Sequence, residues 1–320
     1  MTNIDIEEAE ERTQEEISTN NRIRQIAWIV VGAAVVFFLG LGSGYLKWGQ
    51  DETAEAKQQK EIVQLYEQVK PKEGYNLSIS YGDLGPRLLE GGVINYDVIA
   101  KLYQERGTPL SEDQVKILKS GSSDEIVITA ENANFLLNFF WAVGLANRNS
   151  ILTEGPMVQN SDGQVERFAS TGGWGLATKP VTELYASMDL IPLTAEQQHH
   201  AEEVATGVYR PCCNNPTHFP DCNHGMAMLG LLEWMASKGA SVDEMFKAAK
   251  YFNAYWFPQQ TLETAMYLQL NEGIDFVDAD AKLVVSKRLS SASGFGMVHE
   301  DLQARGALKQ APGQGGGCTN

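Results

Sequence analysis

The chain has 320 residues, of which 43% are hydrophobic and 21% are charged, a composition typical of a folded protein rather than a disordered, collagen-like or multi-span membrane chain. Its 41 acidic residues against 25 basic residues give a net charge of −16 at pH 7. Because binding to a phosphate backbone needs a basic surface, this charge argues against nucleic acid as a partner.

After an acidic N-terminal tail at residues 1–25, the first predicted element is a transmembrane helix at residues 26–46. This segment has 21 residues and no charge, so as a helix it spans roughly 30 Å of hydrocarbon. Trp28 and Tyr45 lie near its two ends, where aromatic rings favour the membrane interface. A cleaved signal peptide is the weaker alternative, because the preceding tail is acidic and no Ala-x-Ala-like cleavage site follows. We therefore expect an uncleaved anchor in the lipid bilayer.

The charges around this span give its orientation. Basic residues are nearly balanced on the two sides, but Arg22 and Arg24 lie close together at the N-terminal edge. The positive-inside rule then favours a single pass through the cell membrane, with a cytoplasmic N-terminus and the large domain outside the cytoplasm. Within the span, Gly40 and Gly44 have the GxxxG spacing that lets two helices approach closely, which predicts a homodimer through this face.

Beyond the span, the pattern predicts a helical stalk at residues 47–74 and one compact, mainly α-helical domain at residues 75–300. Strand patterns are limited to Leu77–Tyr81 and Glu125–Ile128. The glycine-rich residues 301–320 are expected to form a flexible tail. Segments with a helical period recur through the domain, at Tyr96–Arg106, Glu112–Lys119, Ala130–Ala146, Ala195–Thr206, Cys222–Lys238, Val242–Phe257, Gln259–Gln269 and Ala279–Leu289.

Three of these helices begin with a capping-box pair, in which a hydroxyl and the residue three positions later bond each other's backbone N–H groups. The pairs are Ser111 with Gln114, Thr194 with Gln197, and Ser241 with Glu244. They predict where the helices start more sharply than apolar periodicity does.

Cysteine and histidine are concentrated in the segment Tyr209–Met228, which holds three of the four cysteines of the chain. Cys212 and Cys213 lie in a proline-rich loop before an apolar helix. We expect Asp221 to be the N-cap of that helix, which would place Cys222 and His224 in its first turn. There the helix dipole and free N–H groups stabilise a thiolate.

Together, Cys212, Cys213, Cys222 and His224 make a candidate Cys3His ligand set, with His218 as a substitute for any one of them. Such a set suits zinc or monovalent copper. The spacing matches no standard zinc motif, so the signal comes from composition. The sequence thus predicts a membrane-anchored extracytoplasmic protein with a soft-metal site, serving as a metal carrier, sensor or electron-transfer partner.

Two alternatives use the same cysteines. Outside the cytoplasm, Cys212 or Cys213 could form a disulfide with Cys222, which typically stabilises a fold by about 2–4 kcal/mol. The chain would then be a thiol–disulfide redox protein, or a non-catalytic interaction module with a disulfide-stapled loop. No G-x-S-x-G or H-E-x-x-H pattern is present, and the sequence assigns no catalytic residue.

Overall fold

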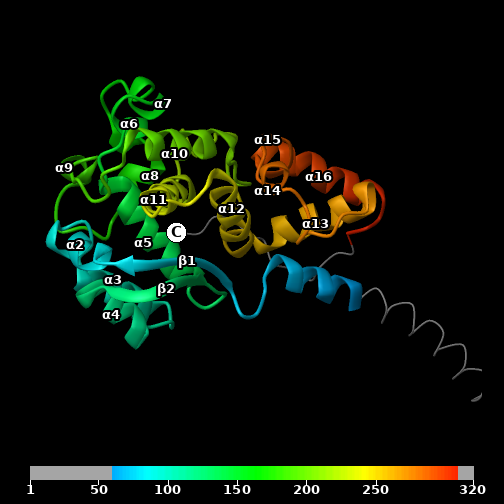
Figure 1. The fold of residues 1–320 in the computed structure, drawn as a ribbon, viewed down its shortest axis with the longest axis horizontal. Coiled ribbons are helices and arrows are strands. Elements are labelled where there is room, and N and C mark those ends of the chain that lie inside the picture. Colours follow the sequence, from blue (N-terminus) through cyan, green and yellow to red (C-terminus); the bar gives the residue numbers. More distant parts are fainter. Residues whose placement is uncertain (1–59, 309–320) are drawn as a thin grey trace, which may run out of the picture. The chain divides into compact units, whose positions relative to one another are not determined.

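The structure is a computed structural model that describes residues 60–308 (Figure 1). The chain divides into two units, residues 1–63 and 64–320, and the second unit holds the cysteine-rich segment. The predicted tail, transmembrane helix and Gly40/Gly44 face lie outside the described residues, as do residues 47–59 of the stalk and residues 309–320. Within residues 60–308, no helix combines the length and the apolar character needed to cross a membrane.

The described chain is mainly helical, as the sequence predicts. Both predicted strands form, somewhat longer than expected, and they pair antiparallel with Tyr75 opposite Ile128. The elements in chain order are β1 (Tyr75–Gly82), α2 (Leu84–Glu90), α3 (Tyr96–Glu105), α4 (Glu112–Ser120), β2 (Ser122–Ile128), α5 (Ala133–Ala146), α6 (Ser150–Thr153), α7 (Pro156–Gln159), η1 (Val165–Arg167), α8 (Ala169–Gly172), α9 (Val181–Leu184), α10 (Ala195–Gly207), α11 (Asn223–Ser237), α12 (Val242–Trp256), α13 (Pro258–Glu272), α14 (Ala281–Val284), α15 (Lys287–Ser290) and α16 (Ala292–Ala304).

All three predicted capping boxes are present. Ser111, Thr194 and Ser241 are the N-caps of α4, α10 and α12, and each hydroxyl accepts a hydrogen bond from the backbone N–H three residues later. The side chain at that third position in turn accepts a bond from the backbone of the cap residue. These reciprocal bonds satisfy two N–H groups that the helix itself leaves free, which explains why the helices start there.

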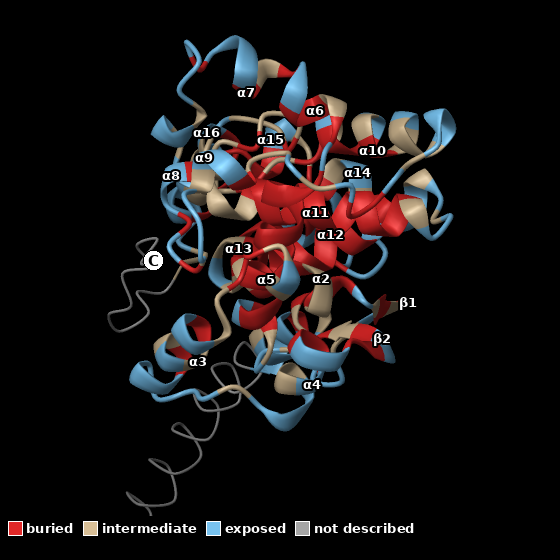
Figure 2. Ribbon diagram, turned by 90° about the vertical axis from the view of Figure 1, so that its left-hand side faces the viewer, coloured by how far each residue is buried: buried red, intermediate tan, exposed pale blue. Residues whose placement is uncertain are grey.

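The main core is built around α5 and α11, which make the most extensive contact of any two helices in the described chain. Both helices are buried along most of their length (Figure 2). A Cβ atom on Gly144 or Gly230 would overlap the backbone of the other helix. Glycine at these two positions therefore allows α11 to lie directly against α5, which fixes the helix that carries Cys222 at its start.

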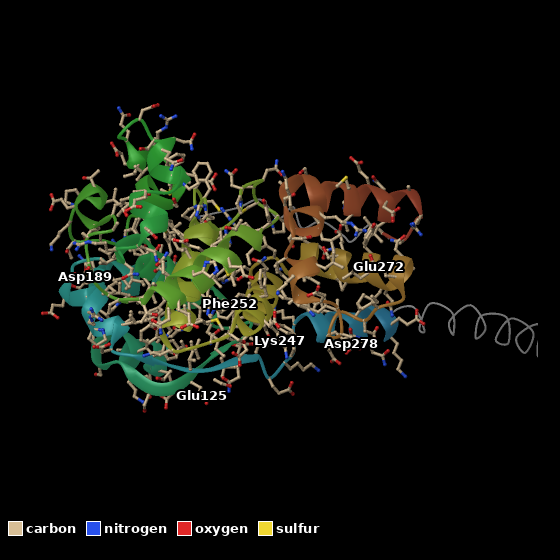
Figure 3. The ribbon with its side chains drawn as sticks, turned by 45° about the horizontal axis from the view of Figure 1, so that its top comes forward. Glu125, Asp189, Lys247, Phe252, Glu272 and Asp278 are labelled. Atoms are coloured by element: carbon tan, nitrogen blue, oxygen red, sulfur yellow. The ribbon has the colours of Figure 1, made fainter. Side chains whose placement is uncertain are left out.

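A second cluster of buried side chains joins residues 64–69 to α12, α13 and α16. Residues 64–69 are helical, and Leu65 and Val69 are buried in this cluster. The C-terminal end of the predicted stalk therefore packs into the domain. On α12, Phe252 faces the interior and is fully buried, whereas Lys247 is exposed (both are labelled in Figure 3).

The C-terminal region differs from the sequence prediction in two ways. The single helix expected over Ala279–Leu289 is broken into α14 and α15, and at the break the carbonyl of Val285 accepts a bond from the Tyr209 N–H. In addition, α16 forms at residues 292–304, where no helix was predicted, and its last residues, 301–304, lie in the predicted flexible tail. The Ser291 hydroxyl caps it, and Val298 and Leu302 are buried, so packing outweighs the poor helix propensity of its glycines.

Candidate metal and thiol site

The predicted ligands lie in the loop between α10 and α11. This loop is tied to the rest of the domain by backbone hydrogen bonds, from Tyr209 N to Val285 O at 2.8 Å and from Thr217 N to Val208 O at 2.8 Å. The start of α16 binds it as well, because the Ala292 N–H donates to the Cys213 carbonyl at 2.9 Å. The cysteine loop is therefore held by elements that follow it by more than seventy residues.

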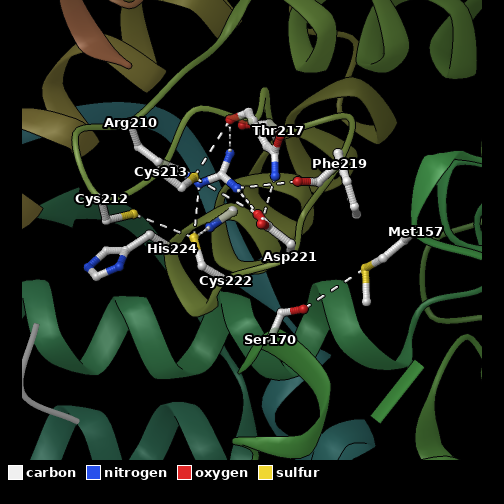
Figure 4. A network of polar contacts seen from close by, with 12 residues as sticks. Met157, Ser170, Arg210, Cys212, Cys213, Thr217, Phe219, Asp221, Cys222 and His224 are labelled. Carbon is white, nitrogen blue, oxygen red and sulfur yellow. Dashed lines mark hydrogen bonds and ion pairs between the residues drawn. The ribbon is translucent and has the colours of Figure 1, made fainter. Parts of the chain in front are cut away.

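Three thiols converge in this loop. The sulfur atoms of Cys212, Cys213 and Cys222 all lie within 4.8 Å of one another, and those of Cys212 and Cys222 are 3.5 Å apart (Figure 4). In residues 60–308, no other group of three His, Cys, Asp or Glu side chains is arranged in this way. All three are free thiols and all are partly exposed. Three soft ligands are thus already gathered where a metal ion could reach them.

Cys222, rather than the predicted Asp221, is the N-cap of α11. Its backbone is extended, and its sulfur accepts a hydrogen bond from the Gly225 N–H at 3.4 Å. The prediction for Asp221 is wrong because its carboxylate is engaged elsewhere. One oxygen lies 3.0 Å from Arg210 Nη2, and the other accepts a bond from Asn215 Nδ2 at 2.8 Å.

The centre of this network is Arg210, which the sequence analysis missed. Its side chain is only 1% exposed. Nε donates to Cys222 Sγ at 3.1 Å, Nη1 donates to the Asn215 carbonyl at 3.1 Å, and Nη2 also reaches the Phe219 carbonyl at 3.3 Å. A buried guanidinium needs such partners to offset its lost hydration, so Arg210 organises the loop by binding it from several sides. The available signal was a basic residue beside two cysteines, with an aspartate eleven positions later.

Hydrogen bonding distributes protons unevenly among the thiols. The pKa of Cys222 is lowered well below its ordinary value, chiefly because Cys212 and Cys213 donate hydrogen bonds to its sulfur, and Arg210 adds to the effect. The pKa of Cys212 is raised, first by its bonds to Cys213 and Cys222 and then by burial. Cys222 is therefore the thiol best able to exist as a thiolate, the form that binds metals.

The two histidines of the predicted set lie outside this three-sulfur group. The His224 ring packs against Phe257, with centroids 4.5 Å apart, and its Nδ1 is buried without a hydrogen-bond partner. Burial lowers the pKa of His224 to about 4, which keeps the ring neutral at pH 7. His218 is held through its backbone, whose N–H donates to the Ala205 carbonyl. The structure thus gathers three of the four predicted ligands, and the fourth stays a prediction.

The arrangement offers three sulfur ligands, one guanidinium that donates a hydrogen bond to Cys222, and one neutral imidazole two residues after the last thiol. Such a set of side chains can bind a soft metal ion, and its thiols can also react with a disulfide. Comparison with protein-family models, with curated proteins and with solved structures finds no match to this chain.

Proposed function

We propose that the protein binds one soft metal ion through the thiolates of Cys212, Cys213 and Cys222, with His224 as the fourth ligand. The observation that carries this proposal is the convergence of three sulfurs within 4.8 Å from two different elements, the loop and the start of α11. A buried imidazole nitrogen without a partner is unfavourable in a folded protein. Metal binding would satisfy Nδ1 of His224, which supports this residue over His218.

Charge favours a divalent ion. Arg210 and Asp221 form an ion pair at 3.0 Å and cancel each other's charge. Three thiolates then leave a net charge of −1 with Zn²⁺ and −2 with Cu⁺. Because uncompensated charge is costly in a partly buried site, zinc fits this environment better than monovalent copper. Zinc has no redox chemistry, so this choice favours a carrier or sensor over an electron-transfer partner.

The partial exposure of all three cysteines bears on the same question. A site that water and small molecules can reach allows the metal to be loaded and removed from the folded protein. With the predicted anchor at residues 26–46 and an N-terminus in the cytoplasm, the site would take up metal on the outer side of the cell membrane. A membrane-anchored extracytoplasmic metal carrier or sensor is therefore the function that the site supports best.

The proposal is tested by metal uptake of the full-length protein, purified in detergent under reducing conditions and dialysed against zinc. We expect one zinc ion per chain, and loss of tight binding when Cys212, Cys213 or Cys222 is replaced by serine. Cys318→Ser is the matched control, because Cys318 is outside the proposed ligand set, and this variant should retain one zinc ion. Equal zinc content in all four variants would contradict the proposal.

A further inference from the structure

We infer that the same site is redox-gated: a disulfide between Cys212 and Cys222 forms on oxidation and releases the metal. This inference rests on the proposed metal-binding function and adds its regulation. It follows from the short distance between the sulfurs of Cys212 and Cys222 and from the additional contacts that hold the Cys213 sulfur.

The sulfurs of Cys212 and Cys222 lie 3.5 Å apart. A disulfide bond is about 2.05 Å long, so the two atoms need to approach by only about 1.5 Å. Cys212 is on the loop and Cys222 caps α11, so the bridge would join two elements without crossing a third. The approach requires rotation of the Cys212 and Cys222 side chains towards each other.

Cys213 has contacts beyond the other two sulfurs. Its sulfur lies 3.8 Å from the Asn215 carbonyl and 3.9 Å from Asp221 Oδ1, so it is held towards the Arg210 side of the loop. A bridge between the adjacent Cys212 and Cys213 would also be strained, because neighbouring residues do not favour disulfide geometry. The pair Cys212 and Cys222 is therefore the one selected for oxidation, and Cys213 remains a free thiol.

The reaction is thiol–disulfide exchange with a low-molecular-weight disulfide, R–S–S–R. The Cys222 thiolate, which accepts a hydrogen bond from Arg210 Nε at 3.1 Å, attacks one sulfur, forms a mixed disulfide and expels R–S⁻. The Cys212 thiolate then attacks Cys222 Sγ and expels the second R–S⁻. The protein loses two electrons, the small disulfide gains two, and the divalent ion leaves because two of its thiolates are consumed.

The release also has a structural basis in the network around Arg210. When Cys222 enters the bridge, Arg210 loses its sulfur partner but keeps its bonds to Asn215, Phe219 and Asp221. The loop therefore stays in place while the ligand set is reduced from three thiolates to one. Reduction of the bridge would restore the site without refolding of the domain.

The test uses zinc-loaded full-length protein treated with oxidised glutathione, with a zinc indicator dye in solution and mass-spectrometric mapping of disulfides. We expect one zinc ion released per two thiols lost, a bridge between Cys212 and Cys222, and full recovery of zinc binding after dithiothreitol. Cys213→Ser should still form this bridge, and Cys212→Ser should not. The Cys213 variant is the matched control, since it removes a ligand but leaves the oxidisable pair.

The outcomes separate the two proposals. If the reduced protein takes up no zinc, both the metal site and its gating are wrong. If zinc binds and remains bound with its thiols intact under oxidised glutathione, only the gating is wrong. Zinc release accompanied by a Cys212–Cys213 bridge or by stable mixed disulfides would likewise overturn the assigned pair.

Discussion

Nε of Arg210 donates a hydrogen bond to Sγ of Cys222 at 3.1 Å, which joins the most buried cation of the loop directly to a proposed metal ligand. The same guanidinium binds two backbone carbonyls and the Asp221 carboxylate. Groups that orient metal ligands in this way usually alter metal affinity by about 10–100-fold when they are removed. Arg210 is thus expected to contribute both to the stability of the loop and to metal binding.

Replacing Arg210 by alanine should lower the free energy of unfolding by about 3–5 kcal/mol, because it leaves a partly buried carboxylate and two carbonyls without their partner. Urea unfolding of the metal-free protein measures this change. The matched control is Arg167→Ala, which breaks an exposed ion pair with Asp162 and should cost less than about 1 kcal/mol. Arg210→Lys keeps the positive charge but loses the several N–H donors of the guanidinium. Its free energy of unfolding should therefore lie between those of the wild type and Arg210→Ala. Equal effects of Arg210→Ala and Arg167→Ala would contradict the assigned role.

Gly225→Ala tests the packing around the guanidinium without removing any polar group. A Cβ atom at Gly225 would overlap Nη2 and Cζ of Arg210, so the variant should displace Arg210 from Cys222 and destabilise the protein by about 1–3 kcal/mol. Gly296 in α16 has open space around it, and Gly296→Ala should be neutral or stabilise by up to about 1 kcal/mol. Thermal unfolding and zinc affinity, measured in parallel, check both changes. A Gly225 variant that behaves like the Gly296 variant would show that Arg210 is free to move.

Substitutions at Cys222 separate its two roles, as helix cap and as ligand. Cys222→Ser keeps an N-cap acceptor, so the metal-free variant should be about as stable as the wild type while zinc binding is lost. Cys222→Ala loses both roles and should be less stable by about 0.5–2 kcal/mol. Calorimetry of the metal-free proteins, followed by zinc titration, distinguishes the two. Tight zinc binding by the serine variant would exclude Cys222 as a ligand.

Local sequence signals predicted much of the fold because they act over three or four residues. The three capping boxes gave the starts of α4, α10 and α12, and short apolar alternation located both strands. These local signals did not predict helix boundaries that depend on contacts between residues far apart in the sequence. Tyr209 binds the break between α14 and α15, and buried Val298 and Leu302 stabilise α16 in spite of its glycines.

The candidate site shows the same division. The clustering of Cys212, Cys213 and Cys222 along the chain predicted that their sulfurs would meet, because a short loop can hardly keep them apart. The role of Asp221 was predicted wrongly, and that of Arg210 was missed. Both depend on where a long side chain is aimed in three dimensions, and the spacing of residues does not encode that direction.

A pH dependence should come from Glu233, which is fully buried in α11 and accepts one hydrogen bond, from Asn147 Nδ2 at 3.0 Å. Burial raises its pKa well above the ordinary value of 4.5, so the folded protein keeps this carboxyl protonated to a higher pH than the unfolded chain does. Its contribution to stability is complete below pH 4.5 and is lost as the pH rises through the folded-state pKa, by up to about 1.4 kcal/mol per pH unit.

Glu233→Gln should remove this loss, so the variant should gain stability over the wild type as the pH rises from 4.5 to 7. Urea unfolding at several pH values measures the free energy of unfolding of both proteins. In the difference between variant and wild type, the contributions of all other titrating groups cancel. Glu300→Gln, at an exposed position, is the control variant against which the pH dependence of Glu233→Gln is compared. A pH-independent difference for Glu233→Gln would mean that the carboxyl is already ionised in the fold.

X-ray absorption spectroscopy of the zinc-loaded, reduced full-length protein tests the central claim most directly, because it counts the atoms bound to the metal. The proposed site predicts three sulfur neighbours at about 2.3 Å and one nitrogen neighbour at about 2.0–2.1 Å. The His224→Ala variant should keep the three sulfurs and lose the imidazole signal. Zinc surrounded mainly by oxygen and nitrogen, or by fewer than three sulfurs, would contradict the assignment of Cys212, Cys213 and Cys222 as the metal site.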